Sequence, residues 1–313
     1  MFKYTSKEIG RIADETNFNK NTCEKVLRLL SVLDFINHGE LSGTLALKGG
    51  TAINLFMLDL PRLSVDIDLD FNLPLDRDGM LARRAEIDSL IRLFMENEGY
   101  RLSNKSRFAH TLDSYIFAYR TAAGSNDVLK IDVNYSNRVH VLSPVTRKST
   151  SLLPEATQTL CLADEELIGS KVNALLTRTT PRDVYDVYNL IKDNKIMDET
   201  LIRKIAIFYV CLASETPIDF EAILSAALAK ISGLEYQRIK ETLIPVLHKG
   251  VKFDVNEVSS LVSSKIEKVF ELDSKDIGFI ERINTKSFDP NFLFEGQTTE
   301  DVSKHPMGLW KTR

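Results

Sequence analysis

The chain has 313 residues, of which 43% are hydrophobic and 27% are charged, a composition typical of a soluble globular protein with one large or two modest domains. The formal net charge of −4 argues against a generally basic nucleic-acid-binding protein but does not exclude RNA held by a local basic surface. No apolar run approaches the roughly 20 residues that span a bilayer, and the opening MFKYTSKEIG lacks the apolar core of a signal peptide. We therefore expect a cytoplasmic protein without a membrane partner.

Three cysteines, Cys23, Cys161 and Cys211, are widely spaced along the chain. No C-x-x-C metal motif occurs, and each cysteine lies in an apolar, helix-like context. An odd number of separated cysteines predicts buried free thiols in a reducing compartment.

Two amphipathic helices are predicted at the N-terminus, over about residues 6–16 and 21–36, because apolar residues recur at helical spacing. The short segment 17–19 forms a turn between them. Two helices joined in this way can read DNA. Their mixed charge favours a helical cap on the next domain instead, and a DNA-binding regulator stays the alternative.

A glycine-rich turn follows the next predicted strand. Apolar residues 45–47 lead into Lys48, Gly49, Gly50 and Thr51, and a brief amphipathic helix comes after them. Glycine backbone N–H groups at a helix N-terminus can bind an anion, and Thr51 can cap that helix or bind a phosphate through its hydroxyl. The G-x-x-x-x-G-K-[ST] loop is absent, so the turn alone is also consistent with an ordinary tight turn.

A strictly alternating strand is predicted over residues 65–71, with Asp66, Asp68 and Asp70 on one face. Carboxylates two residues apart on a strand lie about 6–7 Å from one another, and their repulsion is on the order of 2–3 kcal/mol per pair at an effective dielectric of about 20. Water at a solvated sheet edge or a bound cation must offset it. Mg²⁺ commonly combines one or two carboxylates with substrate phosphates, so turn and strand together predict a site for a metal-bound nucleoside triphosphate.

A loop at 74–79 and a long helix over about 80–97 come next. Sheet is expected over 100–149, with a hairpin-type turn at 124–127 and strands at 100–102, 115–120, 128–135 and 138–142. Asp132 lies on the polar face of the strand over 128–135, where it would be an ordinary solvent-facing residue unless it contributes to the acidic site.

Two consecutive helices form the second polar segment. The first is predicted to run from Asp164, as its N-cap, to about residue 177, with Lys171 two turns in. The second begins at Thr180, and Pro181 followed by Asp183 is typical of an N-terminal capping box. A lysine on a helix is usually a solvated surface residue, so Lys171 alone would not identify a site.

Asp186 lies three residues after Asp183 and shares its helical face, but it has no capping role. Arg178 and Arg182 flank the two acids. From about residue 198 the chain is predicted to be helical, over 201–212, 220–229, 236–243, 255–269 and 276–283, with a loop-rich end at 288–310.

Three short segments resemble the AbiEii/AbiGii family of nucleotidyltransferase toxins, which includes the MenT toxins. K-G-G-T at 48–51 and P-R-L-S-V-D-I-D-L at 61–69 are similar to the family's G-[GS]-[ST] and D-x-D, and 171–186 is similar to its K…R…R-D-x-x-D. The resemblance covers most of the chain and is weakest over 200–285. It implies an α+β (mixed α/β) fold: an N-terminal helical segment, 1–40, a DNA polymerase β-like nucleotidyltransferase core, 41–150, and a mostly helical domain, 151–313, that contributes active-site residues.

The resemblance also implies roles for individual residues. It places the nucleotide against Lys48, Gly49, Gly50, Thr51, Arg62, Ser64 and Arg182. It implies that Asp66 and Asp68 bind Mg²⁺ or Mn²⁺, with Asp132 as a third carboxylate. It further implies that Lys171 touches the phosphates and that Asp186, or Asp183 as second choice, is the base for the incoming hydroxyl.

Such an enzyme would be Mg-dependent and would transfer NMP from an NTP to an acceptor hydroxyl, with loss of pyrophosphate. MenT-type relatives modify the 3′ end of tRNA, which blocks translation, so tRNA or another RNA is the first acceptor expected, and the family implies a cognate antitoxin and phage defence. Scattered basic residues either contact RNA or form a solvated face: Arg101, Lys105, Arg107, Arg138, Arg147 and Lys148. Alternatives are a protein or small-molecule acceptor, and a non-catalytic nucleotide- or DNA-binding regulator.

Overall fold

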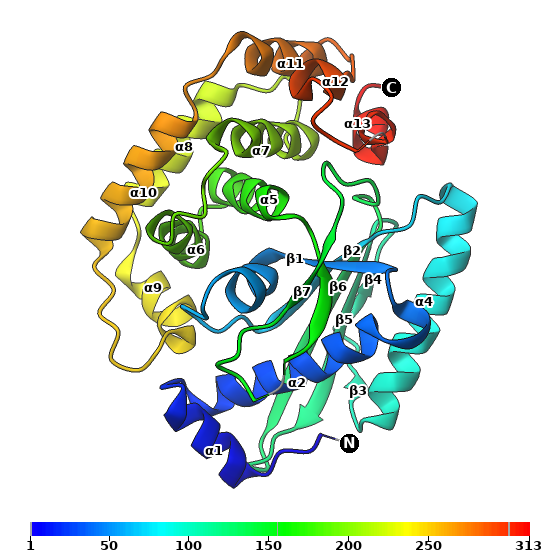
Figure 1. Cartoon of the computed structure of the whole chain (residues 1–313), viewed down its shortest axis with the longest axis vertical. Helices are drawn as coiled ribbons and strands as arrows, with labels where there is room; N and C mark the ends of the chain where they lie inside the picture. The colour runs from blue at the N-terminus through cyan, green and yellow to red at the C-terminus, as the bar shows by residue number, and fades with distance from the viewer. Residues whose placement is uncertain (1, 155, 300) are drawn as a thin grey trace. The chain divides into compact units, whose positions relative to one another are not determined.

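The computed structural model describes residues 2–154, 156–299 and 301–313. The chain divides into two compact units (Figure 1). Unit 1 holds the residues up to 138, then 144–161 and 246–249, and unit 2 holds 139–143, 162–245 and 250–313. The chain therefore passes from one unit to the other more than once.

In the residues that the structure describes, a mixed sheet of eight strands forms the centre of unit 1, in the order β3-β5-β6-β2-β1-β8-β7, with β4 paired to β5. β2 is parallel to β6 and antiparallel to β1, and β1 is parallel to β8. The strands are β1 Leu45–Lys48, β2 Asp66–Phe71, β3 Arg101–Leu102, β4 Arg107–Phe108, β5 Leu112–Arg120, β6 Asn126–Asn134, β7 Val145–Lys148 and β8 Gln158–Cys161.

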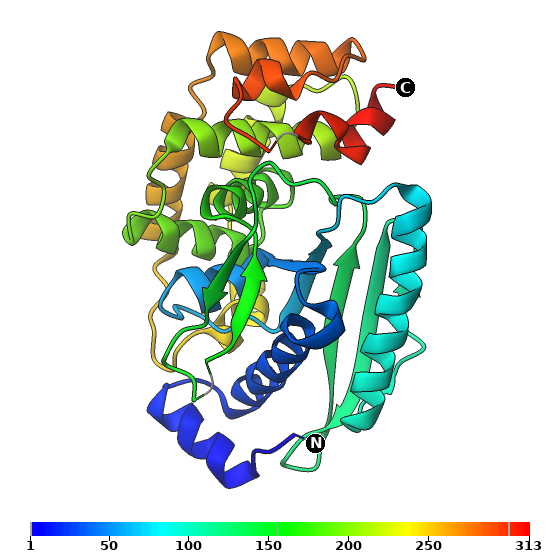
Figure 2. The ribbon, with the colours of Figure 1, turned by 45° about the vertical axis from the view of Figure 1, so that its right-hand side comes forward.

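Two long helices, α2 (Lys20–Asn37) and α4 (Arg77–Asn97), lie on the same side of this sheet (Figures 1 and 2). Phe35 of α2 and Phe94 of α4 stack with their ring centroids 3.9 Å apart. The Tyr115 hydroxyl of β5 donates to Asp88 of α4 at 3.0 Å, which places the Tyr115 face of the sheet under α4.

The two predicted N-terminal helices are confirmed as α1 (Ser6–Glu15) and α2.

The alternation predicted for the acidic strand is also confirmed. Tyr115 pairs with Ile131 of β6, and Ile131 pairs with Ile67 of β2, so these three side chains share the face that α4 covers. Ile67, Leu69 and Phe71 are all buried. The opposite face of the same strand therefore carries its three aspartates.

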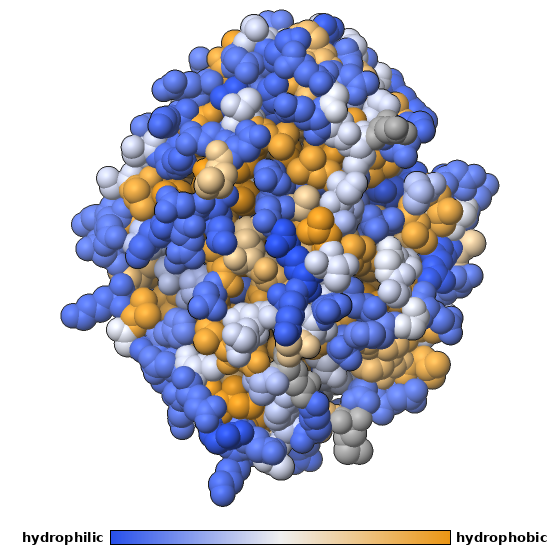
Figure 3. Space-filling model, in the orientation of Figure 1, coloured by the Kyte–Doolittle hydropathy of each residue, from blue (hydrophilic) through white to orange (hydrophobic). Residues whose placement is uncertain are grey.

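Unit 2 is built from helices. They are α5 (Asp164–Thr177), α6 (Pro181–Lys192), α7 (Glu199–Ala213), α8 (Phe220–Ser232), α9 (Tyr236–Thr242), α10 (Val255–Val269), α11 (Ser274–Asn284), α12 (Pro290–Phe294) and α13 (Pro306–Lys311). Gly169 lets α5 pack closely on α7, since a Cβ there would lie 2.5 Å from Cγ2 of Ile205. Phe208 of α7 contacts the rings of Phe279 and Phe294. Polar residues cover most of α11 in the space-filling view (Figure 3).

The strand predicted at 138–142 is wrong. The Asn134 side chain accepts hydrogen bonds from the N–H groups of Ser136 and Asn137, which turns the chain at the end of β6. Residues 139–143 then enter unit 2 as an irregular segment. β7 and β8 were not predicted, because four-residue strands give too few alternating positions for the pattern to be recognised.

Several helix boundaries differ from prediction. α4 begins at Arg77, inside the predicted loop, because the Asp76 side chain accepts the Gly79 N–H and caps the helix. Asp164 is not an N-cap: Ala163 holds that position without a side-chain bond, and Asp164 is the first helical residue. The C-terminal stretch contains the short helices α12 and α13 rather than loop alone.

The three cysteines are free and buried, as predicted. Burial raises the pKa of Cys23 to about 11 and that of Cys211 to about 12, so both thiols stay protonated at neutral pH. Among the helices described here, none combines the length and the apolarity needed to cross a bilayer.

A buried carboxylate fixes the irregular segment 139–143 within unit 2. Glu166 of α5 accepts the N–H of Val141 at 3.0 Å and that of Leu142 at 2.9 Å, and it also accepts the Tyr209 hydroxyl. These two backbone donors are therefore satisfied by a side chain instead of a neighbouring strand. Glu166 was not singled out from the sequence, because nothing in a helical glutamate indicates a distant backbone partner.

Replacing Glu166 by Ala should lower the free energy of unfolding by about 3 kcal/mol or more, because three donors would lose their buried acceptor. Urea unfolding measures this change. Glu165→Ala, one residue away on the same helix, is the control and should stay within about 0.5 kcal/mol of wild type. Equal midpoints for the two variants would show that Glu166 does not hold the segment.

Candidate active site

The glycine-rich turn is shaped by two close approaches. Lys48 ends β1 in an extended conformation, and Gly49 follows with φ +72°, a left-handed value that favours glycine. A Cβ on Gly49 would lie 2.6 Å from Oδ2 of Asp68. A Cβ on Gly50 would lie 2.6 Å from Nη2 of Arg62 and 3.2 Å from Oγ of Ser64. The missing side chains thus let a carboxylate and a guanidinium reach the backbone of the turn.

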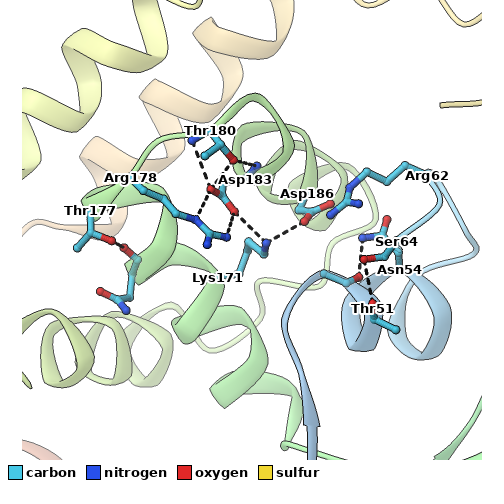
Figure 4. A network of polar contacts seen from close by, with 12 residues as sticks. Thr51, Asn54, Arg62, Ser64, Lys171, Thr177, Arg178, Thr180, Asp183 and Asp186 are labelled. Atoms are coloured by element: carbon cyan, nitrogen blue, oxygen red, sulfur yellow. Dashed lines mark hydrogen bonds and ion pairs between the residues drawn. The ribbon is translucent and has the colours of Figure 1, made fainter. Parts of the chain in front are cut away.

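Thr51 does not cap a helix as predicted, because α3 (Gly49–Ala52) already begins at Gly49 and Lys48 is its N-cap. The buried Thr51 hydroxyl instead donates to the Asp66 carbonyl and lies 2.9 Å from Oγ of Ser64 (Figure 4). It therefore ties the turn to the start of β2. A π-helical segment, η2 (Ile53–Met57), continues from α3.

Arg62 is a buried cation beside this turn, 3% exposed. Its Nη1 donates to the Leu63 carbonyl at 2.9 Å, which holds the guanidinium against Gly50. Ser64 is buried as well. The structure thus brings together six of the predicted site residues within unit 1, at the junction of β1, α3 and β2: Gly49, Gly50, Thr51, Arg62, Ser64 and Asp68.

Asp68 belongs to a row of paired residues that crosses the sheet. It pairs with Lys48 of β1 on one side and with Asp132 of β6 on the other, and Asp132 pairs with Ser114 of β5. Directly paired residues share a face of a sheet. The predicted proximity of Asp132 to the acidic strand therefore agrees with the register, while its role as a metal ligand stays a prediction.

Lysines compensate two of the carboxylates near this row. Lys48 Nζ lies 2.6 Å from Oδ1 of Asp70, and Lys130 Nζ lies 2.6 Å from Oδ2 of Asp132. Ser114 Oγ also donates to Asp132 at 2.6 Å. Lys130 and Ser114 were missed from the sequence. The alternation around Asp132 did place Lys130 on the same face, whereas the position of Ser114 depends on a pairing that no local pattern indicates.

The surroundings of Asp68 disfavour the charged form of its carboxyl group. Burial raises its pKa, Lys48 opposes that shift, and the carboxylates of Asp66 and Asp132 raise it further. In the described part of the chain, no three His, Cys, Asp or Glu residues are placed to hold a metal ion by themselves. The hard oxygens of Asp66 and Asp68 suit an ion such as Mg²⁺ that completes its shell with water and substrate phosphates.

Unit 2 carries a second charged cluster, at the start of α6. Lys171 of α5 is 5% exposed, so it is not the surface lysine that its helical position alone would suggest. Its Nζ lies 3.0 Å from Oδ1 of Asp183 and 2.9 Å from Oδ2 of Asp186 (Figure 4). The structure thus gathers the lysine and both acids of the predicted K…R-D-x-x-D pattern.

Asp183 is held as an ion. Burial alone would raise its pKa, but Lys171 and the two-pronged contact of Arg178 outweigh burial and keep the pKa well below its usual range. The predicted capping box is confirmed, since Asp183 also bonds the backbone and hydroxyl of Thr180. A carboxylate with so low a pKa is a poor general base at neutral pH, and the assignment of Asp186 to that role stays a prediction.

Arg182 has a different environment from its neighbours. Its Nε donates to the Thr242 carbonyl at the end of α9, at 2.7 Å. The contact joins α6 to α9 within unit 2. The predicted contact of Arg182 with a nucleotide stays a prediction, as does that of Lys48, which pairs with Asp70.

The fold and the glycine turn beside paired aspartates are those of a nucleotidyltransferase. Residues 31–263 match the family "Nucleotidyl transferase AbiEii toxin, Type IV TA system", and the chain belongs to that family. The solved structure of the nucleotidyltransferase toxin MenT4 from Mycobacterium tuberculosis H37Rv is similar over 99% of this chain and 100% of that one, with a TM-score of 0.65 and 14% identity. No curated protein sequence matches significantly.

These comparisons confirm the resemblance seen in the sequence and the predicted mixed α/β nucleotidyltransferase fold. The chain is therefore a toxin-type nucleotidyltransferase of a toxin–antitoxin family. At 14% identity, the likeness to MenT4 supports the fold and not a shared acceptor.

Gly49→Ala should displace Asp68 and reduce NTP-dependent pyrophosphate release about 100-fold, since small misplacements at a reacting centre have effects of that size. Gly43→Ala is a matched control, because Gly43 also has a positive φ, +74°, but a Cβ there would meet nothing within 4 Å. Both variants should lose about 1–2 kcal/mol of stability from backbone strain. Equal activity in the two variants would remove the argument that Gly49 makes room for Asp68.

Asp183→Asn should lower the free energy of unfolding by about 3–5 kcal/mol at neutral pH, because Lys171 and Arg178 would lose a buried partner. A lowered folded-state pKa stabilises above the unfolded value of about 3.9, and this stabilisation disappears as pH falls through the folded-state pKa. Urea unfolding should therefore give a constant difference from wild type between about pH 7 and 5 and a smaller one near pH 3. Asp193→Asn, at the exposed end of α6, is the control. A difference that grew in acid would contradict the assignment.

Proposed function

We propose that this protein transfers a nucleoside monophosphate from an NTP to a hydroxyl of RNA, first of all the 3′ end of tRNA, and so blocks translation. The observation that carries the proposal is the approach of the Asp68 carboxylate to the backbone of Gly49, in the turn that Arg62 also contacts. A phosphate-binding turn and a cation-binding carboxylate in direct contact would bring the triphosphate and its metal ion together.

In unit 1, different residues would bind the phosphates and the metal ion. Arg62 and Ser64 would contact the phosphates together with the backbone of the turn, and a buried guanidinium that is already oriented needs little reorganisation. Asp66 and Asp68 would hold Mg²⁺ or Mn²⁺, with Asp132 as a candidate third ligand. When bound, the ion would neutralise phosphate charge and lower the pKa of the attacking hydroxyl.

The reaction forms one P–O bond and breaks another. The acceptor oxygen attacks the α-phosphorus in line, the bond to the β-phosphate breaks, and pyrophosphate leaves. On the sequence pattern we assign the hydroxyl proton to Asp186 and a phosphate contact to Lys171. Support for treating the two as one functional group comes from their 2.9 Å ion pair in unit 2.

The family of this toxin supports a cognate antitoxin as partner, and we propose that the pair acts in the cytoplasm, in phage defence. Two other acceptors or roles compete with RNA. A protein or small-molecule acceptor would use the same site in unit 1. A non-catalytic nucleotide- or DNA-binding regulator would release no pyrophosphate.

Asp68→Asn should reduce transfer at least about 1,000-fold, because the carboxylate nearest the turn would lose its charge. The assay incubates wild type and variant with Mg²⁺, total tRNA and each α-labelled NTP in turn, with and without a chelator. Asp78→Asn, an exposed acid on α4, is the control and should match wild type. Thermal unfolding checks that all three proteins are folded.

Label on RNA that disappears with Asp68→Asn or the chelator would support the proposed reaction and name the nucleotide. Label on protein would replace RNA by a polypeptide acceptor. No label and no pyrophosphate with any NTP would leave the regulator as the better account.

A further inference from the structure

The polar face of the unit 1 sheet continues beyond the aspartates, toward β4. The row that contains Asp68, Asp132 and Ser114 is extended by one more pair, since Ser114 of β5 is paired with Arg107 of β4. Arg107 therefore lies on the same face of the sheet as Asp68. Arg101 of β3 lies on the same face, because it pairs with Ala118 of β5. Ala118 is four residues after Ser114, so the two side chains point to the same side of the strand.

The segment that supplies these arginines is locally basic. From Gly99 to Leu112 the sequence contains Arg101, Lys105 and Arg107 but no Asp or Glu, although the whole chain has a net charge of −4. All three side chains belong to exposed residues. The acid that follows, Asp113, is buried and bonded to Arg84, so it does not neutralise this surface.

A hollow of about 400 Å³ lies beside Arg101 on this part of unit 1. Ala118, Arg120, Asn126 and Asp127 also line it. Asp127 is paired with Lys25 at 2.9 Å, so the arginines dominate the charge of the hollow. A concave surface with two arginines is suited to phosphate groups.

We propose that this surface, defined by Arg101, Lys105, Arg107 and Arg120, docks the phosphate backbone of the RNA acceptor close to its 3′ end. The inference rests on the proposed function and adds the place where the acceptor binds and the direction from which it enters. The NTP turn lies at β1 and α3, and the basic surface lies past β6 and β5, so nucleotide and acceptor approach Asp68 from opposite sides.

The spacing of the strands gives the distance between Arg107 and Asp68. Arg107 is three strand spacings from Asp68 in the row, which is about 14 Å at about 4.8 Å per spacing. Arg107 is therefore too distant to contact the reacting hydroxyl and suits a phosphate a few nucleotides from the end. Arg147 and Lys148 lie on β7, at the other edge of the sheet, and do not belong to this surface.

The test replaces two arginines together, as R101E/R107E. Each phosphate contact to a single strand contributes about 0.7 to the slope of log affinity against log salt, so the double variant should lose about 1.4 from that slope. Its KM for tRNA should rise at least about tenfold, with kcat at saturating RNA unchanged, since these residues would contact the acceptor only outside the reacting centre. R101A/R107A serves as the second variant in case charge reversal disturbs folding.

The matched control is K230E/K240E, which makes the same change of charge at exposed positions of α8 and α9. It should keep the KM of wild type. A length series sharpens the test: the KM for a dinucleotide acceptor should be the same in wild type and R101E/R107E, and that for an oligonucleotide of about ten residues should differ, because only the longer acceptor reaches about 14 Å.

Two outcomes overturn the inference and are distinguishable. If wild type labels RNA and R101E/R107E behaves like the control, the docking surface is wrong while the proposed function stands. If wild type labels no RNA with any NTP, or labels a protein instead, the proposal of an RNA acceptor is wrong, and the proposal of an RNA-docking surface is wrong as well.

Discussion

The contact between the Asp68 carboxylate and the backbone of Gly49 is the constraint on which the candidate site depends. It exists only because no Cβ occupies the space, and it fixes how closely the turn can approach β2. Thr51 and Arg62 reinforce the same approach from within α3 and from the segment before β2. The backbone proposed to bind an anion and the carboxylate proposed to bind a cation are thereby held together, which would reduce the reorganisation that binding requires.

In both units, lysines form ion pairs with aspartates. Lys48 pairs with Asp70, Lys130 with Asp132, and Lys171 with Asp183 and Asp186. A buried carboxylate that lost its cation would be costly, so removal of the lysine from one of the buried pairs would destabilise its unit. Asp70 of the D-x-D-x-D motif is one of these paired acids. The proposed cation site uses the other two carboxylates of the motif, Asp66 and Asp68, with Asp132 as a candidate third ligand.

Local patterns predicted the elements that are governed by local rules. The period-two alternation of β2 and the capping box of α6 are both correct, because burial of one strand face and satisfaction of helix N–H groups depend on neighbours in the sequence. The strand predicted at 138–142 failed for the complementary reason. The N–H groups of Val141 and Leu142 are taken by Glu166, which lies 24 or more positions later in the chain. No pattern around residue 140 contains that information.

The chemical groups of the candidate site can be read from short stretches of sequence, namely a Gly-Gly-Thr turn, an alternating acidic strand and a K…R-D-x-x-D segment, since backbone freedom and side-chain periodicity are local properties. Which of these groups meet depends on the fold. The register of β6 against β2 and of β5 against β6 and β4 brings Asp132, Ser114 and Arg107 into one row with Asp68. Such pairing depends on contacts between residues far apart in the chain, and a shift of one residue would turn every side chain to the opposite face.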